Sequence, residues 1–226
     1  MYKICYYFLL FLMYSVLGWL MEVINSYFIH KRFVNRGFLI GPYCPIYGIG
    51  VLLIISFLND YMDNFLVLFI LAMVICLVLE YLTSYFLELI FKARWWDYSN
   101  NRFNINGRVC LETAIPFGIG GLIIMYFINP LFTGILCKMS DKFLIILSVV
   151  LMILFLADLI ISFLIMLKFR NIGIKSMKDN TEEMNKIVKE YLTKNSRWTK
   201  RLVDSFPNFK IRIEKIKQKY ETYKNS

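Results

Sequence analysis

The sequence predicts an all-α, polytopic membrane helix bundle with about five transmembrane helices and amphipathic cytoplasmic helices at its C-terminus. Three observations lead to this class. Apolar residues make up 58% of the 226 residues, the mean hydropathy is +0.57, and the apolar residues are gathered into long runs. Soluble domains rarely combine these properties, so lipid is the expected solvent for most of the chain.

Five apolar runs are candidates for crossing a hydrocarbon core of about 30 Å at a helical rise of about 1.5 Å per residue. They cover residues 4–29, 45–58, 65–91, 109–128 and 143–167. We therefore divide the chain into a transmembrane domain, residues 1–168, and a basic cytoplasmic tail, residues 169–226.

The second run is the weakest candidate, because its apolar core is short and it follows a stretch rich in glycine and proline, residues 37–48. Proline and glycine there delay the start of a helix or shape an irregular segment inside the protein. The sequence leaves open whether this stretch is re-entrant or begins the second helix. A bundle of four helices with one re-entrant segment is the alternative architecture.

The distribution of lysine and arginine predicts the orientation, because cytoplasmic loops retain these residues during insertion. With the N-terminus outside, 23 of the 26 basic residues fall on the cytoplasmic face, and only Lys3, Lys138 and Lys142 remain outside. From Lys168 onward the chain carries 16 basic and 7 acidic residues. We therefore expect a multi-pass plasma-membrane protein with an external N-terminus and a cytoplasmic C-terminus.

Four carboxylates within the helical runs fall in the cytoplasmic half of the membrane: Glu22, Glu80, Glu112 and Asp158. A charged group at a helix centre costs about 2.5 to 3.5 kcal/mol on insertion, so such side chains usually face the bundle interior. We expect the three glutamates to share one cavity connected to the cytoplasm, with Asp158 at similar depth. The alternative is that these groups only hold helices together. Glu88 is closer to the interface, and we expect it to be solvated.

Two segments that we expect in the cytoplasm carry polar, charged and aromatic side chains that a simple connecting loop does not need. The first, residues 33–48, combines glycines and prolines with polar side chains, which suits an irregular backbone that presents amides to an anion or polar ligand. Its candidate site residues are Asn35, Arg36, Tyr43 and Tyr47.

The second segment covers residues 93–108. Its candidate site residues are Arg94, Trp95, Trp96, Asp97, Asn104, Asn106 and Arg108. Tryptophan favours the headgroup level of a membrane, and arginine with aspartate forms an ion-pair lattice or engages lipid phosphate. The simpler interpretation is an interfacial anchor.

At these segments the chain resembles the CmpB-like family of bacterial type IV ABC-transporter permeases. The resemblance covers about residues 14–130. It rests on the strings Ser15-x-x-Gly18-Trp19-x-x-Glu22, Asn35-Arg-Gly-Phe-Leu-x-Gly-Pro-Tyr-Cys-Pro-Ile-Tyr-Gly48, Leu79-Glu-Tyr-Leu-Thr-Ser84, Arg94-Trp-Trp-Asp-Tyr-Ser99 and Phe103-Asn-x-Asn-Gly-Arg108. It implies a transporter permease in a bacterial plasma membrane.

A P-loop, GxxxxGK[ST], does not occur, so the resemblance implies a separate ATPase subunit. Two other classes stay open: a membrane enzyme acting on lipid or isoprenoid phosphates with the glutamates as acid or base, and a regulatory membrane subunit. HExxH and GxSxG are absent, and the five cysteines lack paired spacing. We therefore assign no catalytic residue, no cofactor and no metal site.

The tail predicts two amphipathic helices, before and after a break at Asp204-Ser-Phe-Pro207. Each has an apolar stripe among basic residues, which suits adhesion to anionic lipids and does not suit nucleic acid. We therefore expect the lipid bilayer as a partner, with anionic lipids at the tail, and the family resemblance implies a separate ATPase subunit as a second one. The sequence leaves the oligomeric state open, a homo-oligomer included.

Overall fold

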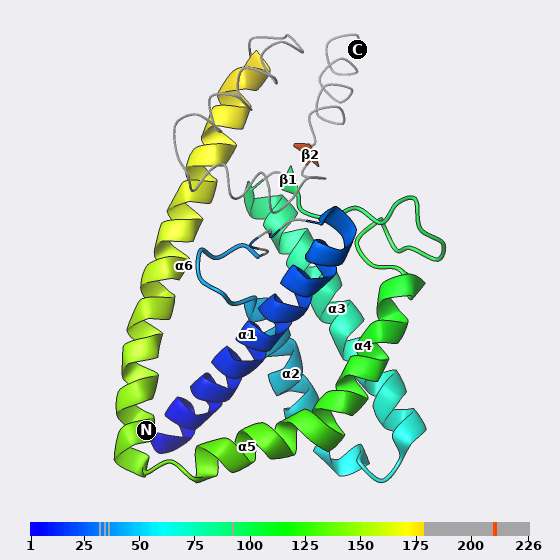
Figure 1. The fold of residues 1–226 in the computed structure, drawn as a ribbon. Helices are drawn as coiled ribbons and strands as arrows, with labels where there is room; N and C mark the ends of the chain where they lie inside the picture. Colours follow the sequence, from blue (N-terminus) through cyan, green and yellow to red (C-terminus); the bar gives the residue numbers. More distant parts are fainter. Residues whose placement is uncertain (32, 34, 36, 92, 179–209, 212–226) are drawn as a thin grey trace.

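The computed structural model describes residues 1–31, 33, 35, 37–91, 93–178 and 210–211, and their regular secondary structure is helical apart from one pair of two-residue strands (Figure 1). The elements are α1 (Tyr2–His30), α2 (Pro45–Leu58), the 3₁₀ turn η1 (Asn59–Tyr61), α3 (Phe65–Phe91), β1 (Ala93–Arg94), α4 (Leu111–Ile123), the π-helical turn η2 (Ile124–Ile128), α5 (Asn129–Cys137), α6 (Asp141–Lys178) and β2 (Lys210–Ile211). The strands β1 and β2 pair antiparallel.

Within the part of the chain that the structure describes, four stretches are long and apolar enough to cross a membrane. They cover Tyr2–Ile29, Phe65–Phe91, Leu111–Cys137 and Asp141–Leu167. The all-α membrane class expected from the sequence is thereby confirmed. The count of about five spans becomes four full-length helices and the shorter α2.

The helix α2 begins at Pro45, where proline fits the first turn because its missing N–H would have no helical partner. Its 14 residues extend about 21 Å at 1.5 Å per residue, which is less than the hydrocarbon thickness. Residues 37–44 precede it in an irregular conformation. We call them the entry segment, because they lead the chain from one end of the bundle down to the start of α2 (Figure 1).

The fourth apolar run extends further than the sequence indicated. Pro130 lacks the N–H of a regular helix, and the turn just before it widens into the π-helix η2, whose last bond runs from the Asn129 N–H to the Ile124 carbonyl. The chain then continues as α5 to Cys137. The predicted end at residue 128 was therefore wrong, because this proline widens the helix without ending it.

Apolar side chains fill the end of the bundle at which the N-terminus lies. One cluster joins α1, α2, α5 and α6 around Tyr14 and Leu144. A second joins α2, α3 and α4 around Ile54 and Ala72. Toward the opposite end, the described residues form a smaller cluster around Phe91, Trp95 and Met166. Polar side chains are concentrated between these regions, as described below.

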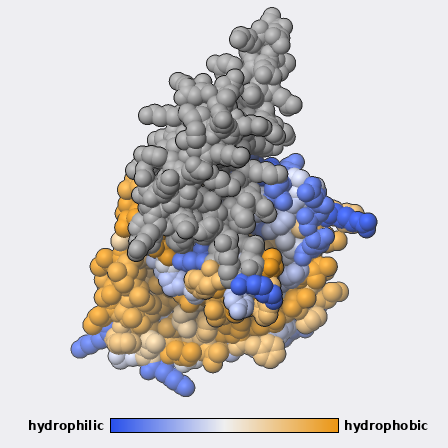
Figure 2. All heavy atoms as spheres, turned by 45° about the horizontal axis from the view of Figure 1, so that its top comes forward, coloured by the Kyte–Doolittle hydropathy of each residue, from blue (hydrophilic) through white to orange (hydrophobic). Residues whose placement is uncertain are grey.

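The irregular loops lie together at one end of the bundle. The entry segment, the loop after β1 and the last turns of α6 lie at the end opposite the N-terminus, whereas η1 and the turn before α6 lie near the N-terminus (Figure 1). In Figure 2 the visible side of the bundle is mainly hydrophobic, with a large group of hydrophilic residues at the loop end and smaller groups at the lower edge. This arrangement suits a lipid-facing belt with one polar end.

The predicted amphipathic helices of the tail lie outside the described residues, apart from Lys210–Ile211, which form the strand β2, and Arg36 lies outside them as well. The helix α6 continues to Lys178, ten residues beyond the expected domain boundary at residue 168.

Candidate functional site

Asp158 on α6 holds the entry segment in place. Its carboxylate accepts the backbone N–H groups of Ile40 at 3.0 Å and Gly41 at 2.7 Å, and the Tyr43 hydroxyl at 2.6 Å. Ser162, one turn further along α6, donates a fourth hydrogen bond at 2.8 Å. An irregular backbone has no helical partners for its amides, so this carboxylate replaces them at membrane depth.

The helix α1 binds the same segment from the other side. The Trp19 indole donates to Asn35 Oδ1 at 2.6 Å, and the Asn35 amide donates to the Ile40 carbonyl at 3.1 Å. The Cys44 N–H donates to the Ser15 carbonyl at 2.9 Å, near the middle of α1. The entry segment therefore reaches deep into the bundle.

Small residues let α1 and α2 approach closely just below this point. A Cβ added to Gly48 would overlap Ser15 Oγ and the Phe11 carbonyl, and one added to Gly18 would overlap the Tyr47 ring. Close backbone approach through small residues is typical of membrane helix pairs. The contact places Tyr47 against α1, where its hydroxyl donates to Glu22 Oε1 at 2.5 Å.

Glu80 on α3 is buried, with 7% of its surface exposed. The Tyr98 hydroxyl donates to Glu80 Oε1 at 3.2 Å. Thr113 Oγ1 lies 3.5 Å from Glu80 Oε2, but it has a single proton and lies closer, at 3.0 Å, to the Cys110 carbonyl. Among the described residues no lysine or arginine pairs with Glu80. The carboxylate is therefore buried with weak hydrogen bonding on one oxygen.

The two glutamates act on the same tyrosine. Burial, then the charge and hydrogen bond of Glu80, and then the charge of Glu22 raise the pKa of Tyr98 above its ordinary value, so this phenol stays protonated and donates. Tyr47 joins this group through its hydrogen bond to Glu22 Oε1. We call Glu22, Tyr47, Glu80, Tyr98 and Thr113 together the glutamate site. Its members come from α1, α2, α3, α4 and the loop between β1 and α4.

Glu112 and Asp158 occupy other environments. Glu112 is exposed in the first turn of α4, where the Asn101 amide donates to it at 2.5 Å. Asp158 belongs to the entry-segment network described above. Of the four predicted carboxylates, Glu22 and Glu80 therefore belong to the glutamate site, whereas Glu112 and Asp158 each have separate partners.

The loop between β1 and α4 carries a lattice of ion pairs. Glu88 Oε2 lies 2.7 Å from Arg108 Nη2 and 3.4 Å from Arg94 Nε, and Arg94 Nη1 lies 3.2 Å from Asp97. Although burial acts to raise the pKa of Asp97, hydrogen bonds from Ser99 and the Arg94 guanidinium hold it below its ordinary value. The lattice expected from the arginines is present.

The expectation that Glu88 is solvated was wrong. Only 14% of its side chain is exposed, because the loop returns two arginines to the end of α3. Trp95 is also a correction to the anchor interpretation. It is buried against Phe38 and Phe91 inside the protein, with ring centroids 5.7 and 6.2 Å away. Trp96 is partly buried and donates to the Arg108 carbonyl at 2.9 Å.

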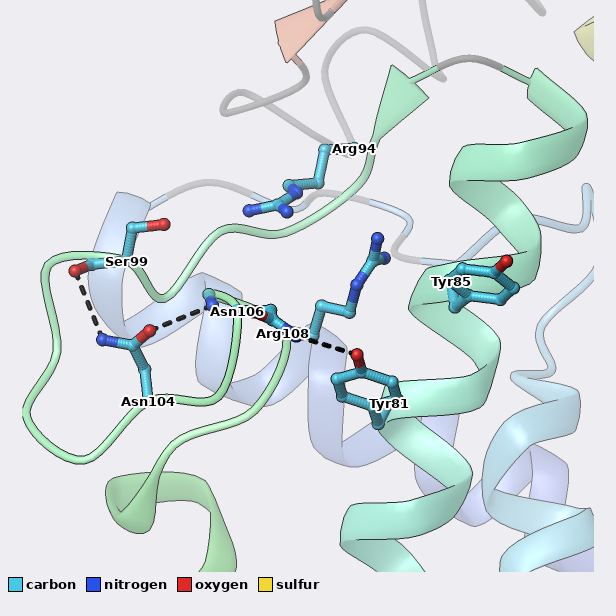
Figure 3. A pocket seen from close by; sticks show the side chains of 8 residues that line it. Tyr81, Tyr85, Arg94, Ser99, Asn104, Asn106 and Arg108 are labelled. Atoms are coloured by element: carbon cyan, nitrogen blue, oxygen red, sulfur yellow. Dashed lines mark hydrogen bonds between the residues drawn. The ribbon is translucent and has the colours of Figure 1, made fainter.

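A pocket of about 510 Å³ lies between α3 and this loop (Figure 3). Its lining residues are Tyr81, Tyr85, Arg94, Ser99, Asn104, Asn106, Gly107 and Arg108. Asn104 braces the loop by donating to the carbonyls of Ser99 and Asn101 and accepting the Gly107 N–H, while Asn106 donates to the Tyr81 hydroxyl at 2.9 Å. We call it the arginine pocket.

Sequence reasoning missed several residues of both sites. Tyr98 and Thr113 complete the glutamate site, and Tyr81 and Tyr85 line the arginine pocket. Tyr98 stands inside the string Trp95-Trp-Asp-Tyr-Ser99, which was a usable signal for it. Thr113 gave no comparable signal, because its role depends on how the loop folds. Within the described residues, no group of three or more His, Cys, Asp or Glu is arranged to hold a metal ion.

Comparison with known proteins gives one match. The family described as "Putative ABC-transporter type IV" matches residues 9–163, about two thirds of the chain. No curated protein and no solved structure matches. The matched region contains the entry segment, the glutamate site and the arginine pocket. The chain therefore belongs to the family described as "Putative ABC-transporter type IV".

Proposed function

We propose that this chain is the membrane permease subunit of a bacterial ABC-type transporter, and that Glu22 and Glu80 lie on its substrate route at the cytoplasmic side. The observation that carries the proposal is the burial of Glu80 without a basic partner among the described residues. A buried carboxylate with incomplete hydrogen bonding is costly, and a bound proton or cationic group relieves that cost.

The surroundings of Glu80 support a role on the substrate route more than a role in holding helices together. Asp158 has four hydrogen-bond donors and pins an irregular backbone, which is what a structural carboxylate in a membrane requires. Glu80 instead has one hydroxyl donor, Tyr98 at 3.2 Å, and a second hydroxyl, Thr113 at 3.5 Å, whose proton lies closer to the Cys110 carbonyl. Loose partners from separate elements allow a carboxylate to exchange them for a substrate group.

The proposal places the loop end of the bundle in the cytoplasm. The basic residues on the loops after α1 and α3 outnumber those on the opposite end, and cytoplasmic loops retain such residues. A reporter that works only in the cytoplasm is therefore expected to be active when fused after Arg102 or at Ser226, and inactive near Asp63 or Lys138. Activity at Asp63 would reverse the orientation and place the glutamate site near the outer face.

An ATPase partner is part of the proposal, because the chain has no P-loop of its own. When the tagged chain is isolated from its native membrane in a mild detergent, a second subunit with a P-loop is expected to accompany it, and the complex is expected to hydrolyse ATP. Replacing the P-loop lysine of that subunit serves as the matched control. It should abolish hydrolysis and leave the complex assembled.

Isolation of the folded chain alone, with no ATP hydrolysis in several mild detergents and in native nanodiscs, would contradict the permease role. A partner whose ATP hydrolysis does not change when the membrane chain is added would contradict it as well, because coupling requires the two subunits to influence each other's energetics.

A further inference from the structure

The arginine pocket has a chemistry that the substrate route does not require. Arg94 and Arg108 line it and are 9% and 8% exposed. Buried arginine is rare unless paired, and here both guanidinium groups share one oxygen of Glu88. Figure 3 shows the side chains of α3 and of the loop facing a common space.

These ion pairs do not use every N–H group of the two arginines. A guanidinium has five N–H groups in a planar fork. Arg94 uses Nε and Nη1 toward Glu88 and Asp97, and Arg108 uses Nη1 and Nη2 toward Ser84 and Glu88. Among the described residues, Arg94 Nη2 and Arg108 Nε have no acceptor. The pocket therefore offers unused cationic donors.

Neutral donors and aromatic rings complete the lining. The Tyr81 hydroxyl accepts from Asn106, so its own proton is available to an occupant. The Arg108 guanidinium lies over the rings of Tyr81 and Tyr85, with centroids at 5.7 and 5.4 Å, which fixes its orientation. Fixed, forked donors suit the tetrahedral oxygens of a phosphate group.

Exposed apolar residues stand beside the pocket residues in the sequence, both on the loop and on α3. On the loop, Phe103 is 80% exposed and Ile105 is 59% exposed, although the surrounding loop is polar. On α3, Leu82 and Phe86 are exposed and directly follow Tyr81 and Tyr85 in the sequence, and Leu89 is exposed one turn further along the helix. Exposed large apolar residues beside a charged pocket mark a surface at the lipid boundary.

From this geometry we propose that the arginine pocket binds the phosphate of an anionic phospholipid headgroup, whose acyl chains lie along the exposed face of α3. The guanidinium groups and tyrosine hydroxyls donate hydrogen bonds to the phosphate oxygens, and the exposed apolar side chains of the loop and α3 contact the acyl chains. This inference is independent of the transport role, because it concerns a different cavity and a different ligand.

Asn106→Asp tests the pocket without removing its framework. The substitution keeps the shape of the side chain and suits the positive φ of 53° at this position, which Asn and Asp tolerate better than other residues. It places a negative charge against the phosphate. We expect phosphatidylglycerol binding to weaken about tenfold, corresponding to about 1.4 kcal/mol. Native mass spectrometry of the full chain, titrated with defined lipids in detergent, measures this.

Asn100→Asp is the matched control, because Asn100 lies exposed on the same loop outside the pocket lining and undergoes the same change in charge. It should bind phosphatidylglycerol as the unchanged chain does. Phosphatidylcholine should bind more weakly in every variant, because its choline opposes the arginines. Equal phosphatidylglycerol binding by the two aspartate variants would overturn the site. Displacement of the lipid by millimolar inorganic phosphate would overturn its assignment to a lipid, since free phosphate would then be the preferred occupant.

Discussion

Replacing Asp158 with alanine should release the entry segment from the bundle and give the largest loss of stability of any single substitution considered for this chain. The change removes the acceptor of two backbone N–H groups and of the Tyr43 hydroxyl. A buried donor left without a partner costs about 1 to 3 kcal/mol, and no water at membrane depth replaces the carboxylate. We expect a loss of about 3 kcal/mol or more.

The reactivity of Cys44 reports this release directly. Cys44 is buried at the end of the entry segment, and its N–H is bound to α1. In a Cys137→Ser background, which removes the exposed thiol, a water-soluble thiol reagent should label Cys44 slowly in the parent chain and rapidly after Asp158→Ala. The labelled peptide identifies the residue, and the thermal midpoint in detergent reports the overall loss.

Asp141→Ala is the matched control, since it removes an exposed carboxylate from the first turn of the same helix. It should lower stability by less than about 1 kcal/mol, the size of a helix-dipole interaction. Asp158→Asn should fall between the two, because one oxygen still accepts a hydrogen bond. Unchanged Cys44 labelling in Asp158→Ala would show that the entry segment does not depend on this carboxylate.

How far the sequence predicted the fold depended on which interactions set each boundary. The bounds of α2 and α3 agreed with the apolar runs, because proline and length determine them locally. The predicted end of the fourth run was wrong. The π-helical turn η2 lets the helix continue past Pro130, although proline has no N–H to donate. The sequence left open how residues 37–48 fold, because the entry segment that precedes α2 depends on partners far away in the chain, on α1 and α6.

The sites show the same division. Glu22 and Glu80 were identifiable as carboxylates in apolar runs. Their shared environment depends on Tyr47 and Tyr98, which approach from other elements and have no fixed spacing from them in the chain. Glu88 was misjudged for the same reason, since its two arginine partners arrive only when the loop folds back. Periodicity and depth locate a charged group, but they do not locate its partners.

Glu80→Gln carries the largest expected effect on activity. Glutamine keeps an oxygen for the Tyr98 hydroxyl and nearly the same volume, but it can neither take up a proton nor hold a cationic group by charge. If Glu80 serves the substrate route, the folded protein should persist and the coupled activity should fall at least about tenfold, or about 1.4 kcal/mol. Glu112→Gln is the matched control, because Glu112 is exposed and lies outside the glutamate site.

The most direct measurement is the rate of ATP hydrolysis by the native complex in nanodiscs, compared between the parent chain, Glu80→Gln and Glu112→Gln at equal amounts of folded complex. The permease account predicts a rate at least about tenfold lower for Glu80→Gln, with an unchanged thermal midpoint, and a parental rate for Glu112→Gln. A parental rate for Glu80→Gln, or a loss that only follows a lower thermal midpoint, would contradict it and leave Glu80 a structural residue.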